Sequence, residues 1–102
     1  MLKILLACNA GMSTSMLMKR MNKAAEARGL DATIDALPIT AAEKVLADWD
    51  IVMLGPQVRH MKKTLEEPAK KANTKVEVID MRDYGMMNGE RVLDAALKTI
   101  GE

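Results

Sequence analysis

The sequence predicts an α/β fold in which one doubly wound sheet of four parallel strands carries helices on both faces. Short apolar runs alternate along the 102 residues with longer segments whose apolar residues recur at helical spacing. The resulting order is β-α-β-α-β-α-β-α, which is typical of a parallel sheet joined by right-handed crossovers. A chain of this length supplies one hydrophobic core, so we expect a single domain over residues 1–102.

The first half of the chain predicts two strands and a long helix. Residues 2–7 form a nearly continuous apolar run, which suits a strand buried on both faces. Residues 8–15 are small and polar and are predicted to form a loop. A helix is predicted to begin at residue 14 or 15 and to run to residue 28, because helix formers dominate and Gly29 follows them. Residues 30–37 alternate apolar and polar side chains, as an edge strand does.

The middle of the chain predicts a short helix, a buried strand and a longer helix. Thr40 is the expected N-cap of the short helix, with Glu43 completing a capping box. Residues 51–54 are apolar and end at a Gly-Pro pair, so they predict a second buried strand. A helix is expected over residues 58–72, and Pro68 inside it should either kink the helix or divide it in two.

The last quarter predicts the fourth strand at residues 76–79, a loop at 80–88 and a final helix at 89–100. In doubly wound sheets, ligands bind beyond the carboxyl ends of the strands, where the winding direction reverses. The segment after the first strand lines that crevice, and here it carries Cys8.

Composition narrows the functional classes. Fifteen Lys and Arg against fourteen Asp and Glu give no basis for a strongly cationic nucleic-acid binder. A single Cys excludes a disulfide framework or a multi-cysteine zinc site, and ten Met with no Phe predict an aliphatic and thioether core. The apolar run at the start is too short for a secretory signal or a membrane span. We therefore expect a cytoplasmic protein that does not insert into membranes and needs no metal.

The segment that carries chemistry combines one thiol, one glycine and three hydroxyls: Cys8, Asn9, Ala10, Gly11, Met12, Ser13, Thr14 and Ser15. A strand leads into it and a helix leads out, so several backbone N–H groups can point into one anion site. The positive end of the same helix should stabilise a thiolate. A nucleophile beside a phosphate cradle predicts a cysteinyl phosphate. The alternative is a buried structural cysteine in a non-enzymatic interaction domain, with the hydroxyls serving only as helix caps.

Three stretches resemble one known family. Residues 4–15, Ile-Leu-Leu-Ala-Cys-Asn-Ala-Gly-Met-Ser-Thr-Ser, resemble the phosphocysteine loop of enzyme IIB from the lactose/cellobiose (chitobiose) branch of the bacterial phosphoenolpyruvate-dependent sugar phosphotransferase system. Residues 53–58 resemble the segment after the third strand of that family, and residues 76–80 with Tyr84 and Gly85 resemble its fourth strand and following loop. The likeness covers nearly the whole chain in order and spacing. It implies a flavodoxin-like sheet with a phosphate loop like that of low-molecular-weight phosphatases.

The resemblance implies a phosphoryl carrier that needs no cofactor. Cys8 would be the nucleophile: it would accept a phosphoryl group from the phosphohistidine of enzyme IIA. It would pass the group to a β-linked disaccharide, of the cellobiose or diacetylchitobiose class, held by membrane enzyme IIC. The backbone of residues 9–15 and the three hydroxyls would bind phosphate. The expected rim of the site is Gly55, Pro56, Gln57 and Tyr84.

The main alternative is a cysteine phosphatase. Low-molecular-weight tyrosine phosphatases are similar in their strand-loop-helix but follow the pattern Cys-x5-Arg-Ser, whereas here Thr14 stands where the arginine would be. That arginine offers a planar bidentate fork to a phosphoryl group in flight, so its absence favours a carrier over a hydrolase. His60 is expected at the surface, and the sequence leaves open whether His60, Arg59 or Asp83 assists the transfer.

Overall fold

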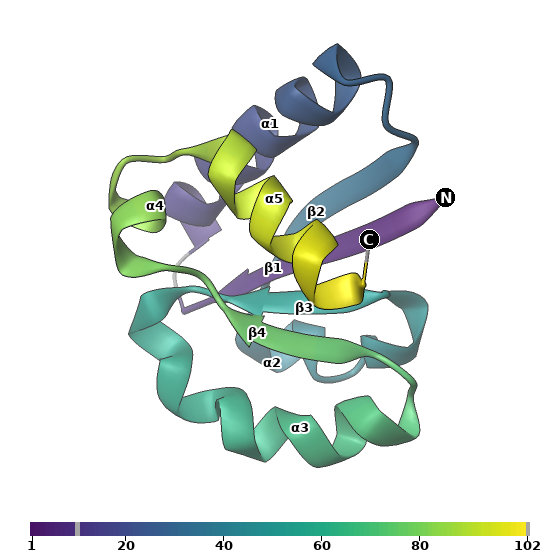
Figure 1. The fold of residues 1–102 in the computed structure, drawn as a ribbon. Helices are drawn as coiled ribbons and strands as arrows, with labels where there is room; N and C mark the ends of the chain where they lie inside the picture. Colours follow the sequence, from purple (N-terminus) through teal and green to yellow (C-terminus); the bar gives the residue numbers. More distant parts are fainter. Residues whose placement is uncertain (10, 102) are drawn as a thin grey trace.

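Four parallel strands form one sheet in the order β2-β1-β3-β4 (Figure 1). The computed structural model describes residues 1–9 and 11–101, with the backbone alone for residues 11–13. The strands are β1 (Leu2–Cys8), β2 (Ala32–Pro38), β3 (Ile51–Leu54) and β4 (Lys75–Val78). The helices are α1 (Gly11–Ala27), α2 (Ile39–Ala42), α3 (Lys62–Lys71), α4 (Met81–Gly85) and α5 (Gly89–Ile100), with 3-10 turns η1 (Leu46–Asp48) and η2 (Pro56–Met61). The predicted doubly wound α/β fold is confirmed.

The sheet separates two hydrophobic cores. Helices α1 and α5 cover one face, and α2 and α3 cover the other (Figure 1). Successive side chains of a strand point to opposite faces. Ile4 and Leu6 therefore enter the α1–α5 core, whereas Leu5 and Ala7 enter the α2–α3 core. This is the physical reason that the first strand reads as a continuous apolar run rather than an alternating one.

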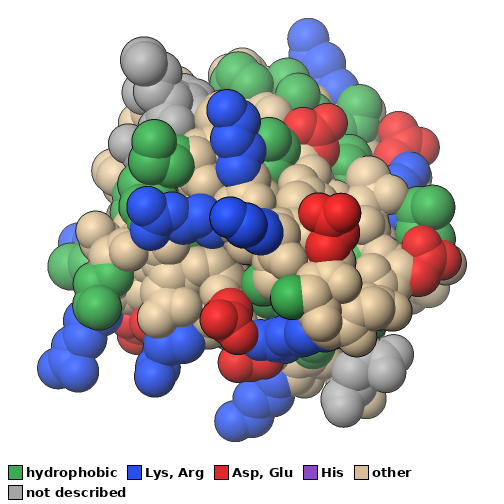
Figure 2. Space-filling model, turned by 90° about the horizontal axis from the view of Figure 1, so that it is seen from above, with side chains coloured by type: hydrophobic (Ala, Val, Ile, Leu, Met, Phe, Trp, Pro, Cys, Tyr) green, Lys and Arg blue, Asp and Glu red, His purple; other side chains and the backbone are tan. Residues whose placement is uncertain are grey.

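Helices α1 and α5 approach each other closely at Gly89. A Cβ on Gly89 would lie 2.6 Å from the backbone carbonyl carbon of Arg20, so only a glycine permits this crossing. Arg28, just past the end of α1, also joins the two helices: one of its guanidinium nitrogens lies 2.7 Å from a carboxylate oxygen of Asp94 in α5. That hydrogen bond raises the pKa of Arg28 above its usual value. Figure 2 looks onto this face and shows positive and negative side chains interspersed over it.

The strand predictions agree with the structure to within two residues, and the predicted final helix agrees in both bounds. The first helix differs, because α1 begins at Gly11 rather than at residue 14 or 15. Residues 8–15 are therefore not one loop: Cys8 ends β1 and residues 11–15 are helical. Small and hydroxyl side chains favour caps and turns in isolation, but here the helix continues toward the strand and its first turn is held by burial of Thr14.

Three further details of the sequence prediction are wrong. Thr40 is not an N-cap: Pro38 holds that position without a side-chain cap, and α2 ends at Ala42. The helix expected over residues 58–72 is not one α-helix: residues 56–61 form η2, with an irregularity at Val58, and α3 begins at Lys62 and runs through Pro68 without being divided there. The expected loop over residues 80–88 contains helix α4, whose N-cap is Asp80.

Candidate functional site

Cys8 lies at the carboxyl end of the central strand β1, with a side chain that is 2% exposed. On one side, Cys8 is in register with Pro38 at the end of β2. On the other side, the backbone N–H of Gly55, just past β3, donates to the carbonyl of Ala7 at 2.8 Å. The chain passes from β2 across β1 to β3, so the winding reverses here. Cys8 therefore lies at the switch point where doubly wound sheets bind ligands.

Gly55 lies directly against Cys8. A Cβ built on Gly55 would be 3.1 Å from the Cβ of Cys8 and 2.9 Å from Oε1 of Gln57. The backbone of Gly55 is extended, with φ −61° and ψ 150°, so the glycine serves close approach rather than an unusual conformation. Pro56 is buried beside it and Gln57 is exposed. The structure thus brings the predicted Gly55-Pro56-Gln57 segment next to the thiol.

A chain of hydroxyls joins the thiol to α4. The Oγ1 of Thr14 lies 2.6 Å from Sγ of Cys8, and the same oxygen lies 3.3 Å from the phenol oxygen of Tyr84. Thr14 is fully buried and Tyr84 is 8% exposed, so the chain is shielded from water. Residues of β1, the first turn of α1 and α4 therefore meet at one point, although residues 14 and 84 are distant in sequence.

The first turn of α1 holds most of the predicted phosphate-binding residues. Gly11, Met12, Ser13, Thr14 and Ser15 lie in it, whereas Asn9 is exposed ahead of it. Ala10 lies outside the described residues. The first N–H groups of an α-helix have no partner within the helix, and its N-terminus carries partial positive charge. The arrangement is therefore able to hold an anion beside Cys8, through backbone groups at a helix terminus.

Tyr84 reaches the site because α4 is ordered by its cap. The carboxylate of Asp80 accepts hydrogen bonds from the backbone N–H of Arg82 at 2.9 Å and of Asp83 at 3.2 Å. Figure 1 shows α4 beyond the carboxyl ends of the strands. Sequence reasoning placed Tyr84 on the rim and missed its contact with Thr14. An Asp after a strand, followed by residues able to form a helical turn, was the signal that could have located α4.

The three residues that the sequence left open as helpers of the transfer, His60, Arg59 and Asp83, lie in η2 and α4. His60 and Arg59 are exposed on η2, so the expected surface position of His60 is confirmed. Asp83 is partly buried, and its carboxylate lies 2.9 Å from Nε of Arg91 in α5. That ion pair joins α4 to α5 and gives Asp83 a structural role in the described arrangement.

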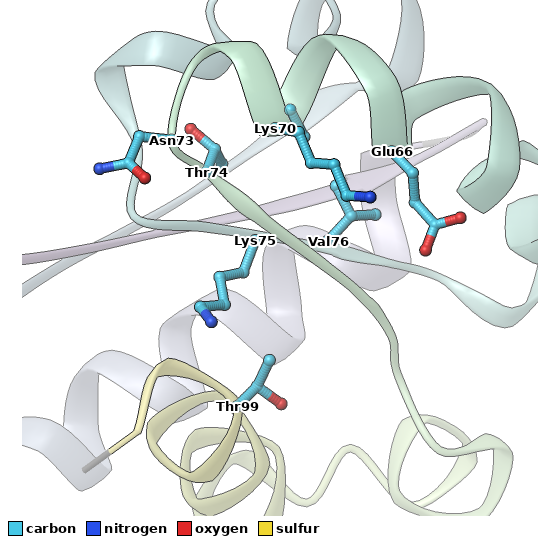
Figure 3. A pocket seen from close by; sticks show the side chains of 8 residues that line it. Glu66, Lys70, Asn73, Thr74, Lys75, Val76 and Thr99 are labelled. Atoms are coloured by element: carbon cyan, nitrogen blue, oxygen red, sulfur yellow. The ribbon is translucent and has the colours of Figure 1, made fainter.

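A hollow of about 310 Å³ lies away from the cysteine. Figure 3 shows the side chains that line it, with Glu66 and Lys70 projecting from α3 and Thr99 from α5. Lys75, which also lines it, begins β4, whereas Cys8 ends the parallel strand β1. The hollow is therefore at the opposite edge of the sheet and takes no part in the candidate site.

Fold and site together define a doubly wound α/β protein whose cysteine is buried at the ligand-binding edge of the sheet, beside a helix N-terminus. In the part of the chain that the structure describes, no three His, Cys, Asp or Glu side chains gather as metal ligands would. None of the described helices combines the length and apolar character needed to cross a membrane.

Comparison with known proteins places this chain in a family. The model of the lactose/cellobiose-specific IIB subunit of the phosphotransferase system (PTS) matches residues 3–95. The oligo-beta-mannoside-specific EIIB component of Bacillus subtilis is 42% identical, over 95% of this chain and 94% of its own length. The cellobiose-specific EIIB component of Lactococcus lactis subsp. lactis is 45% identical, over 91% of each chain. The chain belongs to the lactose/cellobiose-specific IIB family of the sugar phosphotransferase system.

Solved structures agree with this assignment. The cellobiose-specific IIB protein of Borrelia burgdorferi is 45% identical, with a TM-score of 0.78 over 97% of this chain and 91% of that one. The lactose-specific IIB domain of Streptococcus pneumoniae has a TM-score of 0.87 over 96% of each chain at 18% identity, which shows the shared fold. The protein is thus a IIB component for sugar phosphotransfer, and such components act as phosphotransferases together with IIA and IIC components.

Proposed function

We propose that Cys8 is the residue that carries the phosphoryl group. The observation that supports this most directly is the position of its thiol, at the switch point of the sheet, 2.6 Å from a buried hydroxyl in the first turn of α1. A thiolate is favoured at such a terminus, and an anion transferred to it remains within reach of the same N–H groups. Residues 9–15, including the hydroxyls of Ser13, Thr14 and Ser15, form the proposed phosphate cradle.

The proposed cycle has two displacements. The Cys8 thiolate attacks the phosphorus of a phosphohistidine on enzyme IIA, so that an S–P bond forms while the N–P bond breaks and its electron pair returns to the imidazole. A hydroxyl oxygen of the sugar, held by membrane enzyme IIC, then attacks the same phosphorus. The O–P bond forms, the S–P bond breaks, the thiolate is regenerated and the hydroxyl proton is released. The protein acts in the cytoplasm as one domain and needs no cofactor.

The proposed sugar is a β-linked disaccharide of the cellobiose or diacetylchitobiose class. Relatives of nearly equal identity carry different names, since the galactose-specific EIIB component of Lactococcus lactis subsp. cremoris is also 45% identical. Similarity alone therefore does not select the sugar. We place that selection in enzyme IIC, which in this scheme holds the sugar while Cys8 supplies only the phosphoryl group.

The first test is phosphorylation of the purified protein. With phosphoenolpyruvate, the general phosphotransferase proteins and the cognate IIA, the wild type should gain one phosphoryl mass and Cys8→Ser should gain none. Membranes that contain the cognate IIC should then remove the group only when cellobiose or diacetylchitobiose is present, with lactose as the comparison sugar. Lack of uptake by the wild type, or equal uptake by Cys8→Ser, would refute the assignment of Cys8.

The same preparation tests the phosphatase alternative. None of the relatives named above is a phosphatase, and Thr14 points its hydroxyl at the thiol from the place where the phosphatase pattern has arginine. We expect negligible turnover of an aryl phosphate and a phosphorylated form that persists until a sugar acceptor is supplied. Rapid aryl phosphate hydrolysis that Cys8→Ser abolishes would favour the phosphatase instead.

A further inference from the structure

The hydroxyls of Thr14 and Tyr84 form a buried chain that ends on the Cys8 sulfur. The exposed fractions are 2% for Cys8, 0% for Thr14 and 8% for Tyr84. Buried hydroxyls need partners within the protein because water does not reach them. The two contacts, of 2.6 Å and 3.3 Å, connect the thiol to α4, an element that is remote in sequence.

The charge on sulfur decides the direction of the hydrogen bonds. A thiolate has no proton and can only accept, so the Thr14 hydroxyl must donate to it. The Thr14 oxygen then offers its lone pairs to another donor, and the Tyr84 O–H lies within reach. Donors to the ionised form of a group stabilise that form. A donor to the Thr14 oxygen also makes the Thr14 hydroxyl a better donor, because hydrogen bonds in a chain polarise one another.

We propose that Tyr84 is a positioning residue that acts through Thr14 to stabilise the Cys8 thiolate. This inference rests on the proposed function of Cys8 as the phosphoryl carrier. The thiolate is the attacking group when the S–P bond forms and the leaving group when it breaks. Stabilising that charged form raises the fraction of Cys8 that is ready to attack, and it makes the sulfur a better leaving group when the phosphoryl group is delivered.

The order of the contacts sets the relative size of the two contributions. The Thr14 hydroxyl contacts the sulfur directly, whereas the Tyr84 hydroxyl reaches it only through Thr14, and its distance of 3.3 Å is longer than the usual 2.7–2.8 Å or so of a hydroxyl pair. Removing the hydroxyl that donates to the charged sulfur should lower the thiolate-to-thiol ratio about tenfold or more. The Tyr84 hydroxyl is one hydrogen bond further from the sulfur, so its removal should lower the thiolate-to-thiol ratio about twofold to threefold.

The test measures the fraction of thiolate in the purified full-length protein by its ultraviolet absorbance at neutral pH. The chain has one Cys, so the difference between each variant and the same variant with Cys8→Ala reports this thiol alone. Thr14→Val should lower the thiolate-to-thiol ratio about tenfold or more, and Thr14→Ser should restore it. Tyr84→Phe should give the smaller loss. In the Thr14→Val background, Tyr84→Phe should have no further effect.

A matched control separates this role from a general loss of stability. Thr74 is also buried, and its one hydroxyl proton is shared between the carbonyl oxygens of Leu46 and Trp49, which lie 2.6 Å and 2.9 Å from Oγ1 near the opposite edge of the sheet. Thr74→Val should destabilise the fold without changing the thiolate fraction. If Tyr84→Phe does not fold, Asp80→Ala removes the cap of α4, leaves Tyr84 in place and should lower the thiolate fraction in the same direction.

Two results would overturn the inference: a thiolate fraction in Tyr84→Phe equal to that of the wild type, or an equal effect of Tyr84→Phe with and without the Thr14 hydroxyl. Neither measurement needs enzyme IIA or a sugar. A protein that never accepts a phosphoryl group would therefore refute the proposed function while leaving the thiolate result intact. The reverse outcome, normal uptake with no effect of Tyr84, would refute the positioning role alone.

Discussion

The close approach of α1 and α5 at Gly89 gives a prediction that can be worked out quantitatively. Gly89→Ala adds a methyl group where α5 begins, 2.6 Å from the carbonyl carbon of Arg20 and 2.7 Å from the backbone nitrogen of Met21. Both neighbours are backbone atoms of α1, so they cannot turn aside as a flexible side chain would. Since carbon atoms pack at about 3.5–4.0 Å, α5 must retreat from α1 by about 1 Å.

That retreat loosens a well-packed interface. The side chains of Val92, Leu93 and Ala96 are 1%, 0% and 0% exposed on the inner face of α5. Overpacking of a well-filled core costs about 1–3 kcal/mol, and backbone contacts place Gly89 near the upper value. Alanine recovers up to about 1 kcal/mol through the lower entropy of the unfolded chain. The expected net loss is about 2 kcal/mol, which lowers Tm by about 8–16 °C for a domain of this size.

The assay is thermal unfolding followed by circular dichroism, with Gly85→Ala as the matched control. Gly85 is also helical, lies at the end of α4, and has no atom within 4 Å of the place where the added methyl group would lie. The Gly85→Ala variant should therefore have a Tm equal to or slightly above that of the wild type. Equal Tm values for Gly89→Ala and the wild type would refute the reasoning from close approach, and an equal loss in Gly85→Ala would show that glycine content rather than contact matters.

Three other substitutions test the site and its supports. Gly55→Ala should lower the free energy of unfolding, because its methyl group would lie 3.1 Å from the Cβ of buried Cys8, closer than carbon atoms pack. The same methyl group should slow thiol alkylation, and an unchanged rate would contradict this contact. Asp80→Ala should lower the free energy of unfolding, measured in urea, by about 1 kcal/mol, because α4 loses its N-cap. An unchanged free energy would show that the cap does not stabilise the fold. Leu93→Ala should lower the free energy of unfolding by about 2–5 kcal/mol in the same assay, because it leaves a cavity in the core. A smaller loss would show that the neighbouring core side chains move in to fill the cavity.

Local pattern was enough for most of the fold. Three apolar runs and one alternating segment located the four strands, and helical spacing located α5 in both bounds, because burial on a sheet face imposes those periods directly. The errors fall where tertiary contacts override local preference. Gly11 and Ser13 read as loop residues, yet the chain is already helical there, since Thr14 packs inward against Cys8. Helix α4 was missed because its five residues are too few to show a period.

Order and spacing along the chain were sufficient for the α/β class, for the position of Cys8 to within one residue of the end of the first strand, and for the family resemblance. The surroundings of the thiol depend instead on how the elements pack. Gly55 reaches Cys8 through the pairing of neighbouring strands, and Tyr84 reaches Thr14 because the cap of α4 turns the chain back over the sheet. A contact across 70 residues leaves no periodic signal in one sequence, so the hydroxyl chain appears only when the strands and helices are packed together.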